Sequence, residues 1–233
     1  GWSNLNISAH KGETFGLYGN GWLRDDDGNV VIDPLNGLRK VTQNVRLGDI
    51  YPDWTMGVNN NFNYKGFGLS FLVDIRQGGV MYSGTVSNLR TLGLAEETAV
   101  NREERFVDKG VNVDANGKST PNTTPVQSMQ DFWARYAATA NTEGNVFDAS
   151  FVKLREIRFS YALPGKLLGN QKTVKGIELG LEARNVWIIK SHVPHIDPEL
   201  NFFGAGSTVV GEGVEFNSVP STRSWGVNLR ASF

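Results

Sequence analysis

The stretch T-R-S-W-G-V-N-L-R-A-S-F, residues 222–233, decides the fold because its side chains alternate almost without error. Every second residue from Trp225 to Phe233 is apolar, and the residues between them are small, polar or charged. Side chains on a β-strand point in turn to the two faces of its sheet, so this strand has one apolar and one hydrated face. The stretch also closes on an aromatic residue. This combination favours a strand of an outer-membrane β-barrel, whose outside meets lipid and whose inside meets water.

The same alternation recurs along the chain. It is clear in four more segments, residues 54–64, 67–76, 156–163 and 177–184. Only Asn60 breaks the apolar set of the first of these segments, and a weaker candidate strand covers residues 14–24, where glycines blur the pattern. The dipeptide Lys65-Gly66 between the first two segments predicts a tight β-hairpin.

Strand length favours a barrel over a soluble β-sandwich, which would show the same alternation. The clean strands span about 10 to 12 residues, against about 5 to 6 in globular sheets. At about 3.3 Å per residue and a tilt of about 45°, such a strand rises roughly 24 Å. That rise matches the apolar band of about 25 Å around an outer-membrane barrel.

The connections between these strands alternate in length. Long ones cover residues 25–53, 78–148 and 187–221, and short ones cover residues 65–66 and 164–173. Long loops on one side and short turns on the other are typical of bacterial barrels, whose long loops lie outside the cell. We expect two short helices in the second long connection, around residues 86–92 and 128–138.

Composition fits an envelope protein but does not settle the class, since a chain without Cys fits many cytosolic proteins equally well. The chain of 233 residues contains 39% hydrophobic residues, 27 Gly and no Cys. No stretch approaches the roughly 20 apolar residues of a spanning helix. A net charge of -1 gives no electrostatic argument for binding nucleic acid. Residues 1–8 lack the features of a signal peptide, so we expect an export signal upstream or already removed.

Five or six strands do not close a barrel, since the smallest bacterial barrels use about eight. An open sheet in lipid leaves unpaired backbone groups that cost several kcal/mol each. We therefore expect this chain to pair with further strands.

Several strings of the sequence form a set: K-G-E-T-F-G-L-Y-G at 11–19, G-D-I-Y-P-D-W-T-M-G-V-N-N-N-F-N-Y-K-G-F-G-L-S-F-L-V-D-I-R-Q-G-G at 48–79, D-A-S-F-V-K-L-R-E-I-R-F-S-Y-A-L-P at 148–164, E-A-R-N-V-W at 182–187, I-D-P-E-L at 196–200, and P-S-T-R-S-W-G-V-N-L-R-A-S-F at 220–233. In this order they resemble the C-terminal part of SusC/RagA-type TonB-dependent outer-membrane transporters. The resemblance spans nearly the whole chain.

The resemblance implies an all-β fold, an antiparallel transmembrane segment of about 5–6 strands within a larger barrel of about 22 strands. Residues 1–233 would be its C-terminal part, with the plug domain and the earlier strands outside this chain. The implied function is nutrient import, of glycans or peptides, through the outer membrane of a Gram-negative bacterium. The implied partners are the rest of the barrel and the plug, a SusD-like surface lipoprotein, TonB, the barrel-insertion machinery, and lipid or lipopolysaccharide.

The polar faces of the predicted strands supply candidates for the wall of the lumen. These candidates are Asp74, Arg76, Glu156, Arg158, Glu178, Glu182, Arg184, Asn228 and Arg230. Aromatic residues in the long connections could stack on sugars, pack the loops or dock the lipoprotein. They are Phe132, Trp133, Tyr136, Trp187, Phe202 and Phe203. The apolar set Trp225, Val227, Leu229 and Phe233 matches the terminal insertion signal of outer-membrane barrels.

The sequence contains two possible metal sites, but neither motif matches a known metal site well. R-D-D-D-G-N at 24–29 places Asn36, not Glu, at the twelfth position counted from Asp25, so a hairpin tip fits better than an EF-hand. His192 and His195 have H-x-x-H spacing, but Pro194 between them breaks any helix. We therefore expect a structured loop there, and no metal or cofactor.

No nucleophile arrangement emerges, since no Ser lies in a G-x-S-x-G context. We expect no enzymatic activity. The main alternative to a transporter is a soluble carbohydrate-binding β-sandwich module, and an outer-membrane enzyme is the third hypothesis.

Overall fold

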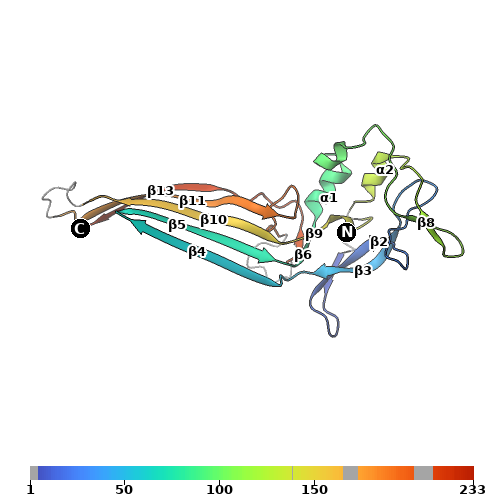
Figure 1. Ribbon diagram of the computed structural model, residues 1–233, viewed down its shortest axis with the longest axis horizontal. Helices are drawn as coiled ribbons and strands as arrows, with labels where there is room; N and C mark the ends of the chain where they lie inside the picture. Colours follow the sequence, from blue (N-terminus) through green and yellow to red (C-terminus); the bar gives the residue numbers. More distant parts are fainter. Residues whose placement is uncertain (1–4, 138, 165–172, 202–211) are drawn as a thin grey trace. The chain divides into compact units, whose positions relative to one another are not determined.

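The computed structural model describes residues 5–137, 139–164, 173–201 and 212–233 (Figure 1). The chain divides into two compact units. The first unit comprises Gly1–Tyr51, Gly79–Ala149 and Val193–Val219. The second comprises Pro52–Gly78, Ser150–His192 and Pro220–Phe233.

The second unit is one five-stranded antiparallel sheet with the order β13-β11-β10-β5-β4. Its strands are β4 (Trp54–Tyr64), β5 (Phe67–Gln77), β10 (Phe151–Ala162), β11 (Gly176–Ser191) and β13 (Ser224–Ser232). All five strands were predicted from the alternation of the sequence. In the part of the chain that the structure describes, β4 and β13 each pair with one neighbour, so the sheet is open and no barrel closes.

The predicted hairpin joins β4 to β5 through Lys65 and Gly66, with φ angles of 47° and 87°. Two successive positive φ angles belong to the type I′ turn, which matches the twist of antiparallel strands. A Cβ atom on Gly66 would lie 2.9 Å from the carbonyl oxygen of Ala162, so the neighbouring strand also favours glycine there.

A β-bulge at Arg155 interrupts β10. Leu154 pairs with Val73 and Glu156 pairs with Leu72, so Arg155 is the extra residue. Because a bulge shifts the alternation by one residue, the sequence pattern breaks between Leu154 and Glu156. The strand was therefore predicted to begin at residue 156, whereas it begins at Phe151.

The first unit contains short strands in three sheets, of order β1-β2-β3, β12-β6-β9 and β7-β8. The strands are β1 (Leu5–Ser8), β2 (Gly16–Trp22), β3 (Val41–Asp49), β6 (Val80–Ser83), β7 (Val111–Val113), β8 (Ser119–Pro121), β9 (Val146–Asp148) and β12 (Val214–Glu215). The helices are α1 (Gly84–Thr91), α2 (Met129–Ala134) and the 3-10 turns η1 (Glu96–Ala99) and η2 (Glu143–Asn145). Both α-helices begin at serines, Ser83 and Ser128, whose hydroxyls accept a backbone N–H from the first turn.

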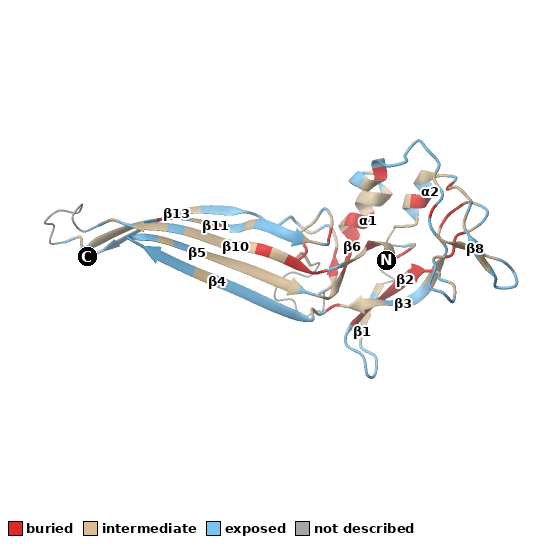
Figure 2. Ribbon diagram, viewed as in Figure 1, coloured by how far each residue is buried: buried red, intermediate tan, exposed pale blue. Residues whose placement is uncertain are grey.

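Three clusters of buried apolar side chains stabilise the first unit (Figure 2). They are centred on Leu17, Ile50, Tyr82 and Val214, on Leu38, Val126 and Phe132, and on Met81, Ala149 and Val193. Apolar burial of this kind drives the folding of ordinary globular domains.

Two predictions about this unit need correction. The candidate strand at residues 14–24 exists as β2, but it pairs with β1 and β3 and does not belong to the five-stranded sheet. Residues 25–53 and 78–148 are not plain loops, since they hold strand β3 and most of the buried clusters. The two helices lie where they were expected, although α2 is shorter. No helix among the described residues is long and apolar enough to cross a membrane.

Candidate functional site

The residues predicted to form the wall of the lumen lie on the polar face of the five-stranded sheet. Residues directly opposite on antiparallel strands share a face. Glu156 faces Arg184, Arg158 faces Glu182, and Glu178 faces Arg230. Following the register across β5, β10, β11 and β13 puts all nine predicted residues on one side. That this side faces a lumen stays a prediction.

Ion pairs connect the strands on this face. Arg158 Nη2 lies 2.9 Å from Glu178 Oε1, and Arg184 Nε lies 3.9 Å from Glu156 Oε1. The bulge residue Arg155 donates to Asp74 Oδ2 at 2.7 Å. Partly exposed pairs of this kind contribute only about 0–1 kcal/mol each. They make the face hydrophilic with both signs of charge, and stabilise the sheet little.

Uncharged side chains line the same face on β4. Asn59, Asn61 and Asn63 are exposed there and lie opposite Leu72, Ser70 and Gly68 of β5. Amide groups donate and accept hydrogen bonds without selecting a charge. The polar face is therefore amide-lined on β4 and charged on β10 and β11.

The opposite face is apolar and exposed. Large side chains on all five strands contribute to it, with Trp225 74% and Val227 80% exposed on β13. Most of β4 and β13 is coloured as exposed in Figure 2. Its other exposed members are Trp54, Met56, Val58, Phe62, Tyr64, Phe67, Leu69, Phe159, Leu179, Leu181, Trp187 and Leu229. Soluble monomers rarely expose so extended an apolar patch, and such patches mark contact with protein or membrane.

The predicted insertion signal lies on this apolar face. Trp225, Val227 and Leu229 project from β13, and all three are exposed, as is Phe233 beyond the end of the strand. Their role in insertion stays a prediction.

The aromatic residues of the predicted loops have different environments. Phe132, Trp133 and Tyr136 pack against one another, with ring centroids 5.1 to 5.8 Å apart, and Phe132 is only 7% exposed. This packing supports a structural role within the first unit. Trp187 lies in strand β11 rather than in a loop. Phe202 and Phe203 lie outside the described residues.

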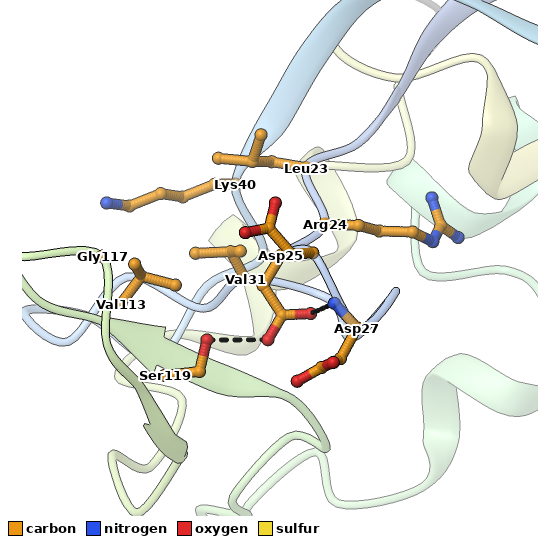
Figure 3. A pocket seen from close by; sticks show the side chains of 10 residues that line it. Leu23, Arg24, Asp25, Asp27, Val31, Lys40, Val113, Gly117 and Ser119 are labelled. Carbon is orange, nitrogen blue, oxygen red and sulfur yellow. Dashed lines mark hydrogen bonds between the residues drawn. The ribbon is translucent and has the colours of Figure 1, made fainter.

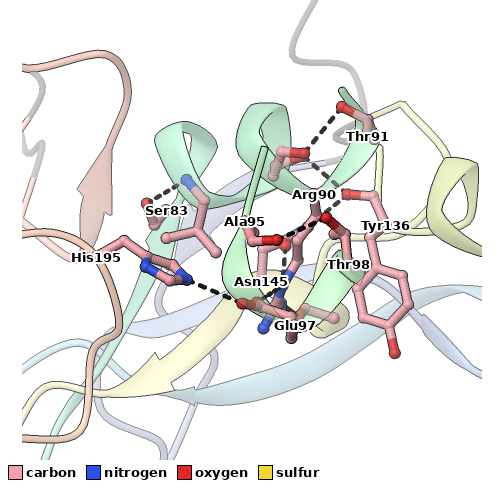
Figure 4. A network of polar contacts seen from close by, with 12 residues as sticks. Ser83, Arg90, Thr91, Ala95, Glu97, Thr98, Tyr136, Asn145 and His195 are labelled. Atoms are coloured by element: carbon pink, nitrogen blue, oxygen red, sulfur yellow. Dashed lines mark hydrogen bonds and ion pairs between the residues drawn. The ribbon is translucent and has the colours of Figure 1, made fainter. Parts of the chain in front are cut away.

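Of the two predicted histidines, His195 belongs to a hydrogen-bonded network (Figure 4). His195 Nε2 lies 3.0 Å from Glu97 Oε2, and Arg90 Nε donates to Glu97 Oε1 at 2.8 Å. Burial raises the pKa of Glu97, but hydrogen bonds from Arg90 and His195 outweigh it and hold the pKa at about 2. The pair connects residues 98 positions apart, as expected for a structured loop. Among the described residues, no group of three His, Asp or Glu side chains could hold a metal ion.

The acidic run at residues 24–29 forms a tight turn, as predicted (Figure 3). Asp25 Oδ1 accepts hydrogen bonds from the backbone N–H groups of Asp27 and Asn29, and Oδ2 accepts one from Ser119. The bond from Ser119 lowers the pKa of Asp25. The turn borders an open cavity of about 590 Å³ with Val31 and Lys40. Asp25 thus serves the turn itself.

Comparisons with known proteins agree with the geometry of the sheet. No family model matches the chain. It is 26% identical over 212 residues to TonB-dependent receptor P3 of Formosa agariphila, a match that covers 89% of this chain and 19% of the receptor. The chain therefore spans about a fifth of the length of that relative.

Solved structures of the RagAB peptide importer share the fold. The open-open state matches with a TM-score of 0.61 and 19% identity, over 99% of this chain and 24% of the importer chain. The closed-closed state gives 0.59 and 17%, over 99% and 25%. The chain thus shows partial homology to a TonB-dependent receptor and shares the fold of part of the RagAB peptide importer, which is consistent with a fragment of a SusC/RagA-type transporter.

Proposed function

We propose that this chain forms part of the wall of a TonB-dependent transporter barrel in the outer membrane of a Gram-negative bacterium. The observation that carries this proposal is the sheet with one exposed apolar face and one polar face. Its strands have 9 to 16 residues, long enough to cross the apolar layer when tilted. The apolar face contacts lipid and the polar face lines the lumen.

The open edges of the sheet support the proposal that further strands complete a barrel. In the described part of the chain β4 and β13 are the edges of the sheet, and each backbone group left unpaired there would cost several kcal/mol in lipid. Further strands therefore pair with these edges and close the barrel, and residues 1–233 form its C-terminal part. A plug domain and a TonB-contacting segment elsewhere in the transporter supply gating and energy.

The transported substrate is a nutrient, a glycan or a peptide, delivered with a SusD-like surface lipoprotein. The polar face supports this class, because it offers amides and charges of both signs. Such a surface forms hydrogen bonds with a polar substrate without strongly selecting its net charge. The relation to a peptide importer adds support for import.

Extraction of the native full-length protein tests the proposal. We expect it to stay with the membrane after washing with salt and carbonate, to need detergent for release, and to migrate faster in gels before boiling than after. Release into the aqueous fraction without detergent would overturn the transporter function and favour the soluble carbohydrate-binding module.

A further inference from the structure

One amide, Asn60, lies on the otherwise apolar face of β4. Its neighbours along the strand on that face are Val58 and Phe62. Directly opposite on β5 lies Phe71, and the two diagonal positions of β5 are aliphatic. The described side chains that border Asn60 on this face are therefore all hydrocarbon.

The amide of Asn60 has no hydrogen-bond partner in the described part of the chain. Asn60 is half-buried, whereas every other residue of β4 is exposed. An amide has two N–H donors and a carbonyl acceptor. Leaving these groups unpaired in an apolar layer is costly, because no water is present there to satisfy them.

Asn60 lies near the middle of β4, far from both ends of the strand. It is 60 - 54 = 6 residues from Trp54 and 64 - 60 = 4 residues from Tyr64. At about 3.4 Å per residue, the nearer end is roughly 14 Å away along the strand, too far for a short side chain to reach polar headgroups. Since the proposed function places β4 across an apolar layer, the partner of this amide must be protein.

The open edge of β4 is the side from which that partner can come. Among the described strands β4 pairs with β5 alone (Figure 1). In lipid the open edge needs a further strand, because its backbone groups must be paired. Side chains directly opposite on two antiparallel strands have Cβ atoms about 4.5–5.5 Å apart, within reach of a short amide.

The other open edge of the sheet gives a contrast. On β13 the apolar face carries Trp225, Val227, Leu229 and Ala231, with no polar side chain between them. A strand that pairs with β13 therefore needs no hydrogen-bonding side chain on this face. The requirement is specific to the edge at β4.

We infer that the strand pairing with the open edge of β4 carries an uncharged amide or hydroxyl side chain directly opposite Asn60, and that the two side chains form a hydrogen bond on the lipid-facing side. This inference rests on the proposed function. Asn, Gln, Ser and Thr fit the position, since each of them both donates and accepts. A charged partner does not fit, because a charge is far more costly than an amide in the apolar layer.

Such a pair would define the register between β4 and its new neighbour. A slip of one residue moves the partner side chain to the polar face and leaves Asn60 unpaired. The two strands are thus held in one alignment by a pair that apolar side chains alone would not supply.

Asn60→Leu tests the pair, because leucine has nearly the size of asparagine but no hydrogen-bonding group. The urea midpoint of unfolding is measured for the full-length protein in phosphatidylcholine vesicles. We expect the midpoint to fall by about 0.5–1 M, because the partner side chain is left unpaired. A midpoint that rises or stays unchanged would overturn the inference, since removing a lone amide from lipid is favourable.

Leu69→Asn is the matched control. It places the same amide on the same face of β5, where Phe62 of β4 and Phe159 of β10 lie directly opposite. We expect its midpoint to fall as well, because this amide finds no partner. An unchanged midpoint would show that the face tolerates a lone amide, and would remove the reason for a partner at Asn60.

Cross-linking identifies the partner. A photoreactive p-benzoylphenylalanine at position 60 marks the neighbouring strand in the outer membrane, and disulfides between Asn60→Cys and single cysteines along that strand find the position opposite. We expect cross-links within one polypeptide and an amide or hydroxyl residue at that position. Changing this residue to an apolar one together with Asn60→Leu should restore the urea midpoint. An apolar residue opposite Asn60, or cross-links only between two polypeptides, would overturn the inference.

Labelling with a membrane-impermeant maleimide separates this inference from the proposed function. Asn60→Cys and its polar-face neighbour Asn61→Cys are compared in the full-length protein, with cysteines outside this chain changed to serine, since the chain itself has none. Protection at position 60 with labelling at position 61 supports the lipid-facing sheet, whatever the urea midpoints show. Equal labelling at both positions would overturn the inference and the proposed function together.

Discussion

The two units of this chain use apolar side chains in opposite ways. The first unit buries them in three clusters, with Leu17 and Ile50 fully inaccessible. The five-stranded sheet instead exposes a continuous apolar face that includes Leu181 and Val227. The first arrangement is stable in water because burial removes apolar surface from it. The second leaves apolar surface exposed, which fits the proposed contact with lipid, so the contrast shows that the two units meet different surroundings.

Truncating a side chain of the buried clusters should have the largest effect on the free energy of unfolding. It tests whether apolar burial stabilises the first unit. Ile50→Ala removes three carbons from a fully buried side chain, and we expect a loss of about 2–5 kcal/mol of unfolding free energy. Urea unfolding followed by tryptophan fluorescence measures it. Leu35→Ala, at an exposed site, is the control with little change expected. Equal losses in the two variants would contradict the assignment of the core.

A charge on the apolar face should have the next largest effect. Leu181→Arg places a guanidinium near the middle of the apolar layer and should cost about 2–4 kcal/mol. Ser70→Arg on the polar face of β5 is the control, with little change expected. The urea midpoint of refolding into lipid vesicles measures both. An unchanged urea midpoint for Leu181→Arg would contradict the difference between the apolar and the polar face.

The acid stability of the first unit should depend on Glu97. The pKa of Glu97 is lowered to about 2, below its ordinary value in the unfolded chain. The stabilisation is therefore complete above about pH 5 and lost as the pH falls toward 2. Since Glu97 is partly exposed, we expect Glu97→Gln to remove about 1–2 kcal/mol at pH 7.

Unfolding curves of the wild type and of Glu97→Gln between pH 7 and pH 2 measure this dependence. The two curves should converge at the acid end. A constant difference across that range would show that the ionisation of Glu97 contributes nothing.

The ion pairs of the polar face should have the smallest effect. Arg158 and Glu178 are both partly exposed, so a double-mutant cycle with Arg158→Ala and Glu178→Ala should give a coupling of about 0–1 kcal/mol. Refolding into vesicles again supplies the free energies. A coupling above roughly 2 kcal/mol would mean that this face is dry rather than water-filled.

Much of the sheet could be predicted from the sequence because one of its faces is apolar and the other is polar. Alternation is visible only when one face is polar, as in β4 and β13. Strand β2 is buried on nearly every residue, so its alternation is lost and its sheet was assigned wrongly. The bulge at Arg155 left a signal, the slip of the pattern before Glu156, which marks a shift of register.

The stagger between neighbouring strands of the sheet could not be predicted from the sequence, because it depends on register. Register follows from turn geometry and bulges, including the irregular pairing near Asn185 of β11. The hydrogen bond between Glu97 and His195 could not be predicted from the sequence either, since the two residues are 98 positions apart.

A labelling scan along β13 tests the central claim most directly. Each residue from Ser224 to Ser232 is replaced singly by cysteine in the full-length protein, in its own outer membrane, and treated with a membrane-impermeant maleimide. We predict that labelling alternates, with Asn228→Cys and Arg230→Cys labelled and Val227→Cys and Leu229→Cys protected. Uniform labelling of both sets would contradict a sheet that separates lipid from a water-filled lumen.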